Sequence, residues 1–214
     1  MYLSKLLLNP RCRQVWREIQ NPYEMHRTLS KAFPFGNEAE NNRILFRTEQ
    51  EEGIGVSVLV QSVLKPDWSL LTVSENYFLT GNYHPHCVKE FSTELPAGNL
   101  YHFKLRANTV RRDKATGKRV GVYDEKDLCD WLSRKSLNAG FSLIGFQVRK
   151  ENQIVASIPG AVNKHNATFA SAVFQGILKV ENPSLFSDTI RSGLGAAKGL
   201  GFGMLSLVSY SEVE

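Results

Sequence analysis

Alternating hydrophobic and polar positions predict most of the strands of this chain. The first is the segment YLSKLLL at residues 2–8, whose alternation is typical of a half-buried strand. An acidic turn at 51–55 joins two more, at 43–50 and 55–63. The remaining strands are predicted at 99–110, 141–150, 167–180 and 204–209, and 152–160 is expected to be the hairpin partner of 141–150.

Helical spacing of apolar positions predicts a helix at 11–20 and a second at 22–33. The second begins after Asn21, which can cap it, with Pro22 in the first helical position. Pro34 and Gly36 are expected to end it. The apolar positions that define the first helix are Val15, Trp16 and Ile19.

Two further helices are predicted at 124–140 and 182–195, the latter again starting with Asn and Pro. The segment 66–71 favours a turn that leads into a short helical or irregular piece. Residues 83–98 contain two prolines and little periodicity, so they are interpreted as a linker.

Each half of the chain therefore follows the order strand, helix, two strands, helix, strand. This order predicts an α+β protein of two tandem ferredoxin-like (βαββαβ, RRM-like) domains, at 1–90 and 97–214. No repeat is visible at the level of single residues. In the first half, the second helix and the last strand have the weakest patterns.

Composition narrows the functional classes. The 214 residues are 42% hydrophobic, and the net charge of +5 with a pI near 9.1 favours an anionic partner: nucleic acid, an acidic membrane or an acidic protein. Three widely spaced cysteines and the absence of a CxxC pair argue against a disulfide framework and a structural zinc site. The apolar run near the N-terminus is too short for a signal peptide. These features predict a protein of a reducing compartment, the cytoplasm, without a structural zinc site, and no cofactor is expected.

The helix at 22–33 has an unusual polar side. At about 100° per residue, the apolar residues gather on one side and leave another to Tyr23, His26, Arg27, Ser30 and Lys31. Histidine can move a proton near neutral pH, lysine can stabilise charge on phosphorus, and tyrosine can donate a hydrogen bond. Such a set would suit metal-independent RNA cleavage, in which the ribose 2′-OH attacks the adjacent phosphate. An ordinary half-exposed helix explains the same residues.

Two further segments suit a phosphate-bearing ligand. The stretch FKLRANTVRRDKATGKRV, at 103–120, is strongly basic and contains a turn-like KATGK, so it either follows a nucleic-acid backbone or forms a solvated loop. The loop GLGAAKGLGFG, at 193–203, is dense in glycine around Lys198. It fits neither GxxxxGK[ST] nor GxGxxG, and it precedes a strand, which disfavours P-loop and Rossmann binding. A tight connector is the alternative.

Together, NPYEMHRTLSKAF, LRANTVRR…TGKRV and GLGAAKGLGFGMLSL resemble, in order and spacing, the CRISPR-associated endoribonucleases of type I-E systems, the CasE family. MYLSKLLLNP and PDWSLL also resemble that family. The resemblance implies RAMP-superfamily ferredoxin-like domains and cleavage of the CRISPR precursor RNA at the base of each repeat hairpin without metal. It implies a 2′,3′-cyclic phosphate product, retention of the mature crRNA, and other Cascade subunits as partners.

The resemblance places the catalytic role on Tyr23, His26 and Lys31. The expected RNA-binding residues extend from the same helix into the basic strand, its loop and the glycine loop: Arg27, Ser30, Arg106, Asn108, Arg111, Arg112, Lys114, Lys118, Arg119, Arg149, Lys150, Gly195, Lys198, Gly199 and Gly201. The chain departs from the family in its groove hairpin, where 147–169 carries few basic residues. Two alternatives stay open: a non-catalytic RNA-hairpin-binding subunit, and an enzyme that uses a nucleotide or CoA at the glycine loop.

Overall fold

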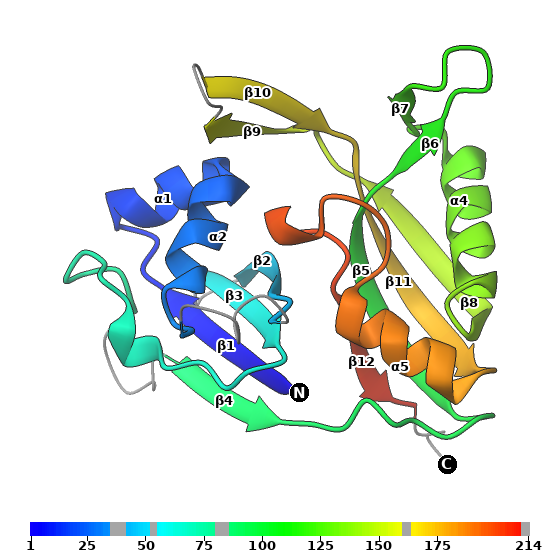
Figure 1. Cartoon of the computed structure of the whole chain (residues 1–214), viewed down its shortest axis with the longest axis horizontal. Helices are drawn as coiled ribbons and strands as arrows, with labels where there is room; N and C mark the ends of the chain where they lie inside the picture. Colours follow the sequence, from blue (N-terminus) through cyan, green and yellow to red (C-terminus); the bar gives the residue numbers. More distant parts are fainter. Residues whose placement is uncertain (35–41, 52–54, 80–85, 160–163, 211–214) are drawn as a thin grey trace. The chain divides into compact units, whose positions relative to one another are not determined.

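A computed structural model describes residues 1–34, 42–51, 55–79, 86–159 and 164–210. The chain divides into two compact units (Figure 1). The first unit comprises Met1–Ser92, Val155–Ala167 and Gly199–Gly201, and the second comprises Thr93–Ile154, Thr168–Lys198 and Phe202–Glu214. Within the described residues, no helix is both long and apolar enough to span a membrane.

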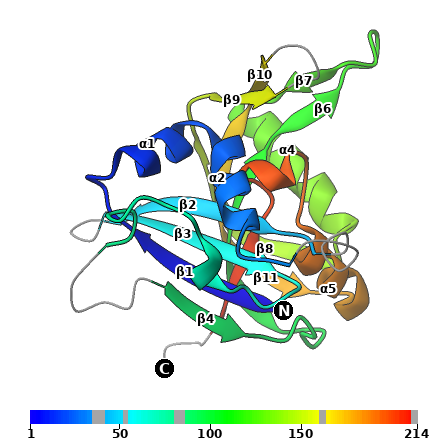
Figure 2. The same ribbon diagram turned by 60° about the vertical axis from the view of Figure 1, so that its left-hand side comes forward.

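The first unit is built on a four-stranded antiparallel sheet. Its strands are β1 (Tyr2–Leu8), β2 (Leu45–Glu51), β3 (Gly55–Ser62) and β4 (His86–Glu90), in the spatial order β2-β3-β1-β4. Two helices, α1 (Arg13–Gln20) and α2 (Pro22–Ser30), lie against one face of this sheet (Figure 2). Between β3 and β4 the chain forms only a short 3-10 turn, η1 (Trp68–Leu70).

The second unit has the same strand order, counted along its own chain. The sheet runs β12-β5-β11-β8 with all neighbours antiparallel. Its strands are β5 (Leu100–Asn108), β8 (Phe141–Lys150), β11 (Ser171–Val180) and β12 (Leu205–Ser209). The helices α4 (Glu125–Leu137) and α5 (Pro183–Ser192) pack their aromatic residues on it, with ring centroids 5.8 Å apart for Trp131 and Phe174 and 5.6 Å apart for Phe141 and Phe186.

Two short strand pairs and a 3-10 turn are the remaining described elements of the two units. In the second unit, β6 (Val110–Arg112) and β7 (Arg119–Gly121) form a short hairpin around the predicted KATGK turn. A second pair, β9 (Ile154–Pro159) and β10 (Lys164–Phe169), makes its own two-stranded sheet. The glycine loop contains a single 3-10 turn, η2 (Lys198–Leu200).

Most predicted elements are confirmed, with four corrections. The expected linker contains β4, which pairs with β1; of its described side chains only Val88 is even half-buried, so this edge strand lacks the alternation that would identify it. The described part of the segment 152–160 forms β9, which pairs with β10 and not with β8; β8 pairs with β11. The strand predicted at 167–180 is two strands, β10 and β11, separated at Ala170.

The fourth correction concerns the two N-terminal helices. The helix predicted at 22–33 ends at Ser30, and the next three residues form turns with i to i−3 hydrogen bonds. In α1, Trp16 was expected on the apolar side but is 38% exposed. Glu18, a charged residue, is buried. Gly36, the turn residues 52–54 and residues 83–85 of the expected linker lie outside the described part of the chain.

Candidate active site and basic cavity

The helix α2 is held in place by a buried carboxylate. Glu18 of α1 is 1% exposed and accepts hydrogen bonds from Thr28 Oγ1 at 2.7 Å, Tyr77 Oη at 2.5 Å and Gln14 Nε2 at 2.8 Å. Burial and the neighbouring Glu18 charge raise the pKa of the Tyr77 hydroxyl, which therefore stays protonated and continues to donate. Three donors satisfy a charge that would otherwise be costly to bury, and one of them belongs to α2.

The start of α2 departs from the prediction in one respect. Asn21 occupies the cap position, and Pro22 follows as expected, but the Asn21 side chain makes no capping hydrogen bond. Its amide instead pairs with the backbone of Ser157 in β9: Nδ2 donates to the Ser157 carbonyl, and Oδ1 accepts from the Ser157 N–H, both at 3.2 Å. Asn21 thus connects α2 to the β9–β10 hairpin within the first unit.

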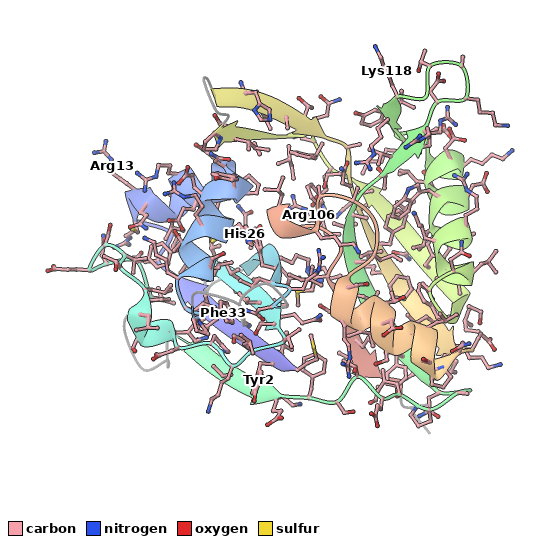
Figure 3. All side chains as sticks on the ribbon, viewed as in Figure 1. Tyr2, Arg13, His26, Phe33, Arg106 and Lys118 are labelled. Atoms are coloured by element: carbon pink, nitrogen blue, oxygen red, sulfur yellow. The ribbon has the colours of Figure 1, made fainter. Side chains whose placement is uncertain are left out.

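The predicted helical faces are confirmed. Met25, Thr28 and Leu29 are buried, whereas Tyr23 and His26 are half-buried. Figure 3 labels His26 on α2. Tyr23, His26 and Ser30 follow one another at single-turn spacing, so their side chains form one stripe. Lys31 is exposed and comes directly after the last helical residue, about 140° from His26 by helical geometry.

His26 has two different ring nitrogens. Nδ1 is buried and has no hydrogen-bond partner, whereas Nε2 is not among the buried, unpaired atoms of the described residues. The ring lies parallel to Phe46, with an interplanar angle of 8° and centroids 6.4 Å apart. Burial lowers the pKa of His26 from its ordinary value of 6.5, because the apolar surroundings disfavour the imidazolium. At neutral pH burial therefore favours the neutral imidazole, which can accept a proton.

The other predicted residues of α2 have protein partners of their own. Ser30 Oγ donates to the His26 carbonyl oxygen at 2.7 Å, and Arg27 is paired with Glu24 at 2.9 Å on the exposed surface. An exposed pair of this kind contributes little to stability, so Arg27 can exchange its partner at low cost.

The glycine loop brings backbone close to side chains of the protein itself. A Cβ added to Gly199 would lie 3.6 Å from His26 Nε2, and one added to Gly201 would lie 3.3 Å from the Phe46 ring. In the second unit, Gly195 faces Trp131 at 3.4 Å, and the Lys198 side chain passes close to Gly203. These contacts give the glycines a packing role in addition to the phosphate contact expected from sequence.

Part of the predicted basic segment lines a cavity. Arg111, Arg112 and Lys114 border a space of about 700 Å³ in the second unit, together with the α4 residues Trp131, Arg134, Lys135 and Asn138. The acidic neighbours are engaged, since Asp113 accepts from Thr116 and Asp127 pairs with Arg111. Hydrogen bonds from Thr116 lower the pKa of Asp113, so it stays ionised. The cavity is nevertheless lined by five cations.

The hairpin beside this cavity carries like charges opposite one another. Arg112 of β6 is directly paired with Arg119 of β7, an arrangement that destabilises an isolated hairpin. Lys114, Lys118 and Arg119 are all exposed. A polyanion placed on the hairpin would relieve this repulsion.

The remaining predicted RNA-binding residues are distributed over the second unit. Arg106 Nε donates to Glu151 at 2.6 Å, and its guanidinium lies 5.5 Å from the Phe202 ring centroid, so this residue braces the base of the glycine loop. Asn108 is 5% exposed and its Oδ1 has no partner among the described residues. Arg149 and Lys150 are exposed at the end of β8, where Arg149 lies 3.5 Å from Glu151.

Four residues were missed by sequence reasoning. Arg134 and Lys135 lie in the last turn of α4, where basic residues are expected for any helix, so nothing marked them as part of a cavity. Glu18 interrupts an apolar pattern, and that interruption is a usable signal for a buried, paired charge. Phe46 sits in an ordinary strand pattern, and only the structure brings it to His26.

These observations define a mixed α and β protein built on antiparallel sheets, with a histidine site on a helix and a separate cationic cavity. The chain belongs to the CasE family of CRISPR-associated proteins: residues 1–208 match the family described as CRISPR associated protein.

The relatives of the chain extend over its full length. It is 37% identical to the CRISPR-associated endoribonuclease Cse3 of Thermus thermophilus, over 97% of this chain and 99% of the relative. A solved structure of Cse3 bound to 19 nt RNA superposes with a TM-score of 0.84 at 34% identity, covering 97% of this chain and 100% of the other. The protein Cas6e of Escherichia coli superposes with a TM-score of 0.69 at 26% identity, covering 98% and 100%.

Proposed function

We propose that this protein is an endoribonuclease that cleaves CRISPR precursor RNA at the base of the repeat hairpin without a metal ion. The observation that carries the proposal is His26, an α2 imidazole whose burial lowers its pKa and so favours the neutral form, in a chain 37% identical to an endoribonuclease. The strand order of the two sheets supports a further part of the proposal, that each unit is a ferredoxin-like domain, divided near the predicted boundaries 1–90 and 97–214.

The proposed chemistry uses two residues of α2 and the lysine that directly follows it. His26 Nε2 takes the proton of the ribose 2′-OH, and the 2′-oxygen attacks the adjacent phosphorus. The bond from phosphorus to the 5′-oxygen breaks, and the leaving oxygen takes a proton from the Tyr23 hydroxyl. Lys31 stabilises the additional negative charge on the phosphoryl oxygens. The products are a 2′,3′-cyclic phosphate and a 5′-OH, with both protons accounted for.

We assign the base role to His26 because burial favours its neutral form. A residue with a lowered pKa is deprotonated at neutral pH and can accept a proton, whereas an acid must begin the reaction protonated. Tyr23, half-buried one turn earlier on α2, is the proposed donor. Lys31 acts through its charge and length, since its side chain is exposed and starts beyond the helix.

The cationic cavity and the β6–β7 hairpin are proposed to hold the RNA backbone. Their charges contact phosphates and therefore supply affinity more than sequence readout. Arg27, Ser30, Arg149, Lys150, Lys198 and the glycines at 195, 199 and 201 stay in the proposal as further contacts. Arg106 and Asn108 contribute mainly by supporting the glycine loop, because Arg106 is bound to Glu151 and Asn108 is buried.

After cleavage the protein is proposed to keep the mature crRNA and to join other subunits of Cascade in the cytoplasm. The name of one relative supports this assembly step. The Escherichia coli relative is a CRISPR system Cascade subunit, 24% identical over 97% of this chain. Such a subunit would need both the cutting site and a surface that retains the product.

Cleavage in EDTA tests the proposal. The substrate is a labelled CRISPR-repeat hairpin from the same source, and the control is the same RNA with a 2′-deoxy nucleotide immediately upstream of the cut. We expect the first RNA to yield a cyclic phosphate and the second to bind without being cut. Cleavage of the deoxy RNA would contradict attack by the 2′-OH, and loss of cleavage in EDTA would contradict metal independence.

The alternative function is a non-catalytic subunit that only binds the RNA hairpin. The cationic cavity favours it independently, because that cavity lies in the second unit and includes no residue of α2. Binding of both RNAs with no cleavage of either would establish this reading and return the polar side of α2 to an ordinary surface.

A further inference from the structure

Two aromatic rings of the first unit lie parallel at the proposed active site. Phe46, from β2, is 1% exposed, and its ring plane is within 8° of the His26 imidazole plane at a centroid distance of 6.4 Å. This separation lies within the range of offset-stacked aromatic pairs. No hydrogen bond holds the imidazole at Nδ1, which has no partner among the described residues.

The segment Gly199–Gly201 runs across both rings. A Cβ on Gly199 would meet Nε2 at 3.6 Å and the two adjoining ring carbons at 3.8 Å each. Because these three distances are nearly equal, that position lies above the imidazole plane and not in line with the Nε2 lone pair. A Cβ on Gly201 would meet the Phe46 ring at 3.3 Å. The glycine segment therefore packs on the faces of the two rings and does not itself approach Nε2 along its lone pair.

We propose that Phe46 is a positioning residue for RNA cleavage: with Gly199 it fixes the plane of the His26 imidazole so that Nε2 faces the 2′-OH. The second torsion of histidine is broad, so an imidazole without a hydrogen bond rotates unless packing restrains it. Most active-site histidines are oriented by a carboxylate or carbonyl at the other nitrogen. In this protein the apolar ring of Phe46 orients the His26 imidazole, and the same apolar contact favours its neutral form.

This inference rests on the proposed endoribonuclease activity, and it assigns Phe46 a role beyond its place in the core. Phe46 belongs to the same buried cluster as Phe33, which is 3% exposed and packs edge-on against Trp68. Replacing either ring by leucine removes a similar packing contribution. Only Phe46 has His26 as a ring partner, so Phe33 provides the matched control.

The experiment compares Phe46→Leu with Phe33→Leu, at a temperature well below both melting temperatures. Three quantities are measured: the dissociation constant for the uncut hairpin, the single-turnover cleavage rate at saturating enzyme, and the melting temperature. We expect both variants to melt earlier and to bind RNA within about twofold of the wild type. Only Phe46→Leu should cleave slowly, by about 10- to 100-fold, since a small misplacement of a reacting group costs a rate of this order.

Substitutions of Gly199 test the positioning of the His26 ring from the glycine loop. They change no residue of the hydrophobic core. Gly199→Ala places its methyl at ordinary contact distance from the imidazole, so its effect on RNA binding measures the contact proposed for this glycine without displacing the ring. Gly199→Val adds methyl groups that need the space of the ring, and its cleavage rate at saturating enzyme should fall by about 10- to 100-fold relative to Gly199→Ala. Gly145→Val is the control, because a Cβ there meets nothing within 4 Å.

Each outcome bears on a different statement. If Phe46→Leu and Phe33→Leu cleave at the same rate, or if Gly199→Val cleaves as fast as Gly199→Ala at saturating enzyme, the positioning role is wrong. If Phe46→Leu does not fold, the valine variant alone decides. Failure of the proposed function is recognised separately, because the wild type would then not cleave, or His26→Ala would cleave normally.

Discussion

The helices α2 and α5 begin in the same way but have different proposed roles. Each starts with Asn and Pro, and the two Asn residues have similar backbone angles, φ −124° and ψ 91° at Asn21 and φ −128° and ψ 102° at Asn182. Each helix buries the same three positions after its proline. These are Met25, Thr28 and Leu29 in α2, and Phe186, Thr189 and Ile190 in α5.

The difference lies on their outward sides. Where α2 has Tyr23 and His26, the corresponding positions of α5 have Ser184 and Ser187, which line a different depression of the second unit. The buried positions decide that each segment is a helix and which side faces its sheet. The outward positions are free of that constraint, and this freedom allows one of two similar helices to carry reactive groups.

Substitutions at corresponding positions of α2 and α5 should have very different effects on cleavage. Replacing His26 by Ala removes the proposed base, so the single-turnover cleavage rate should fall by at least about 100-fold while the hairpin dissociation constant changes less than about threefold. The control is Ser187→Ala at the corresponding position of α5, which loses a 2.8 Å hydrogen bond to Thr93 and should cleave normally. A slow Ser187→Ala variant would show that the outward side of α5 also matters.

The pH dependence of cleavage sharpens the assignment of His26. As a base it must be neutral, and burial lowers its pKa from 6.5, so the rate should be constant near pH 7. It should fall about tenfold per unit only below the lowered pKa, on the acidic side of 6.5. The rate of chemistry is measured at saturating enzyme from pH 4.5 to 8, with binding checked at each pH. A rate that instead decreases as the pH rises through this range would make His26 the acid.

The second unit is expected to contribute affinity and not chemistry. Arg134→Ala removes one cation of the cavity, so hairpin binding should weaken by about five- to tenfold and its salt dependence should decrease by about one phosphate contact. The saturated cleavage rate should stay the same. Lys126→Ala is the control, an exposed cation of the same helix that does not line the cavity. Equal effects of the two variants would mean that the cavity contributes to RNA binding only through general positive charge.

The elements could largely be predicted from sequence because burial and periodicity are local properties. The faces of α2 and the caps of α4 and α5 follow from spacing and from residue type alone, and Asp124 and Asn182 cap as such residues usually do. The candidate residues of α2 came from the same local pattern. Their meaning came from the family resemblance, since polar residues on one side of a helix are more often a solvated surface.

What sequence could not supply depends on contacts between distant segments. Phe46 lies twenty positions from His26, and Gly199 lies much further along the chain. The edge strand β4 and the separate β9–β10 sheet were misjudged because strand pairing is decided by neighbours and not by the strand's own pattern. Asn21 was predicted as a side-chain cap from its residue type and position. It instead binds the backbone of Ser157, a partner that is recognisable only in the folded protein.

The two cap residues, Asn21 and Asn182, should respond differently to the same substitutions. Asn182 Oδ1 accepts from the Leu185 N–H at 3.1 Å, so Asn182→Ala should lower the stability of the protein by about 1 kcal/mol, whereas Asn182→Asp should keep the cap and the stability. Asn21 needs both an acceptor and a donor for Ser157. Alanine and aspartate at position 21 should therefore both disturb the hairpin, because a carboxylate cannot donate to the Ser157 carbonyl.

Hydrogen exchange at the Ser157 amide measures this difference. Both substitutions of Asn21 should speed exchange there by about five- to tenfold, which corresponds to the loss of one ordinary hydrogen bond. The substitutions of Asn182 should leave Ser157 unchanged, and thermal melts supply the stability comparison. Normal exchange at Ser157 in Asn21→Asp would mean that the accepting oxygen alone holds β9, and Asn21 would then differ from Asn182 only in which backbone N–H it binds.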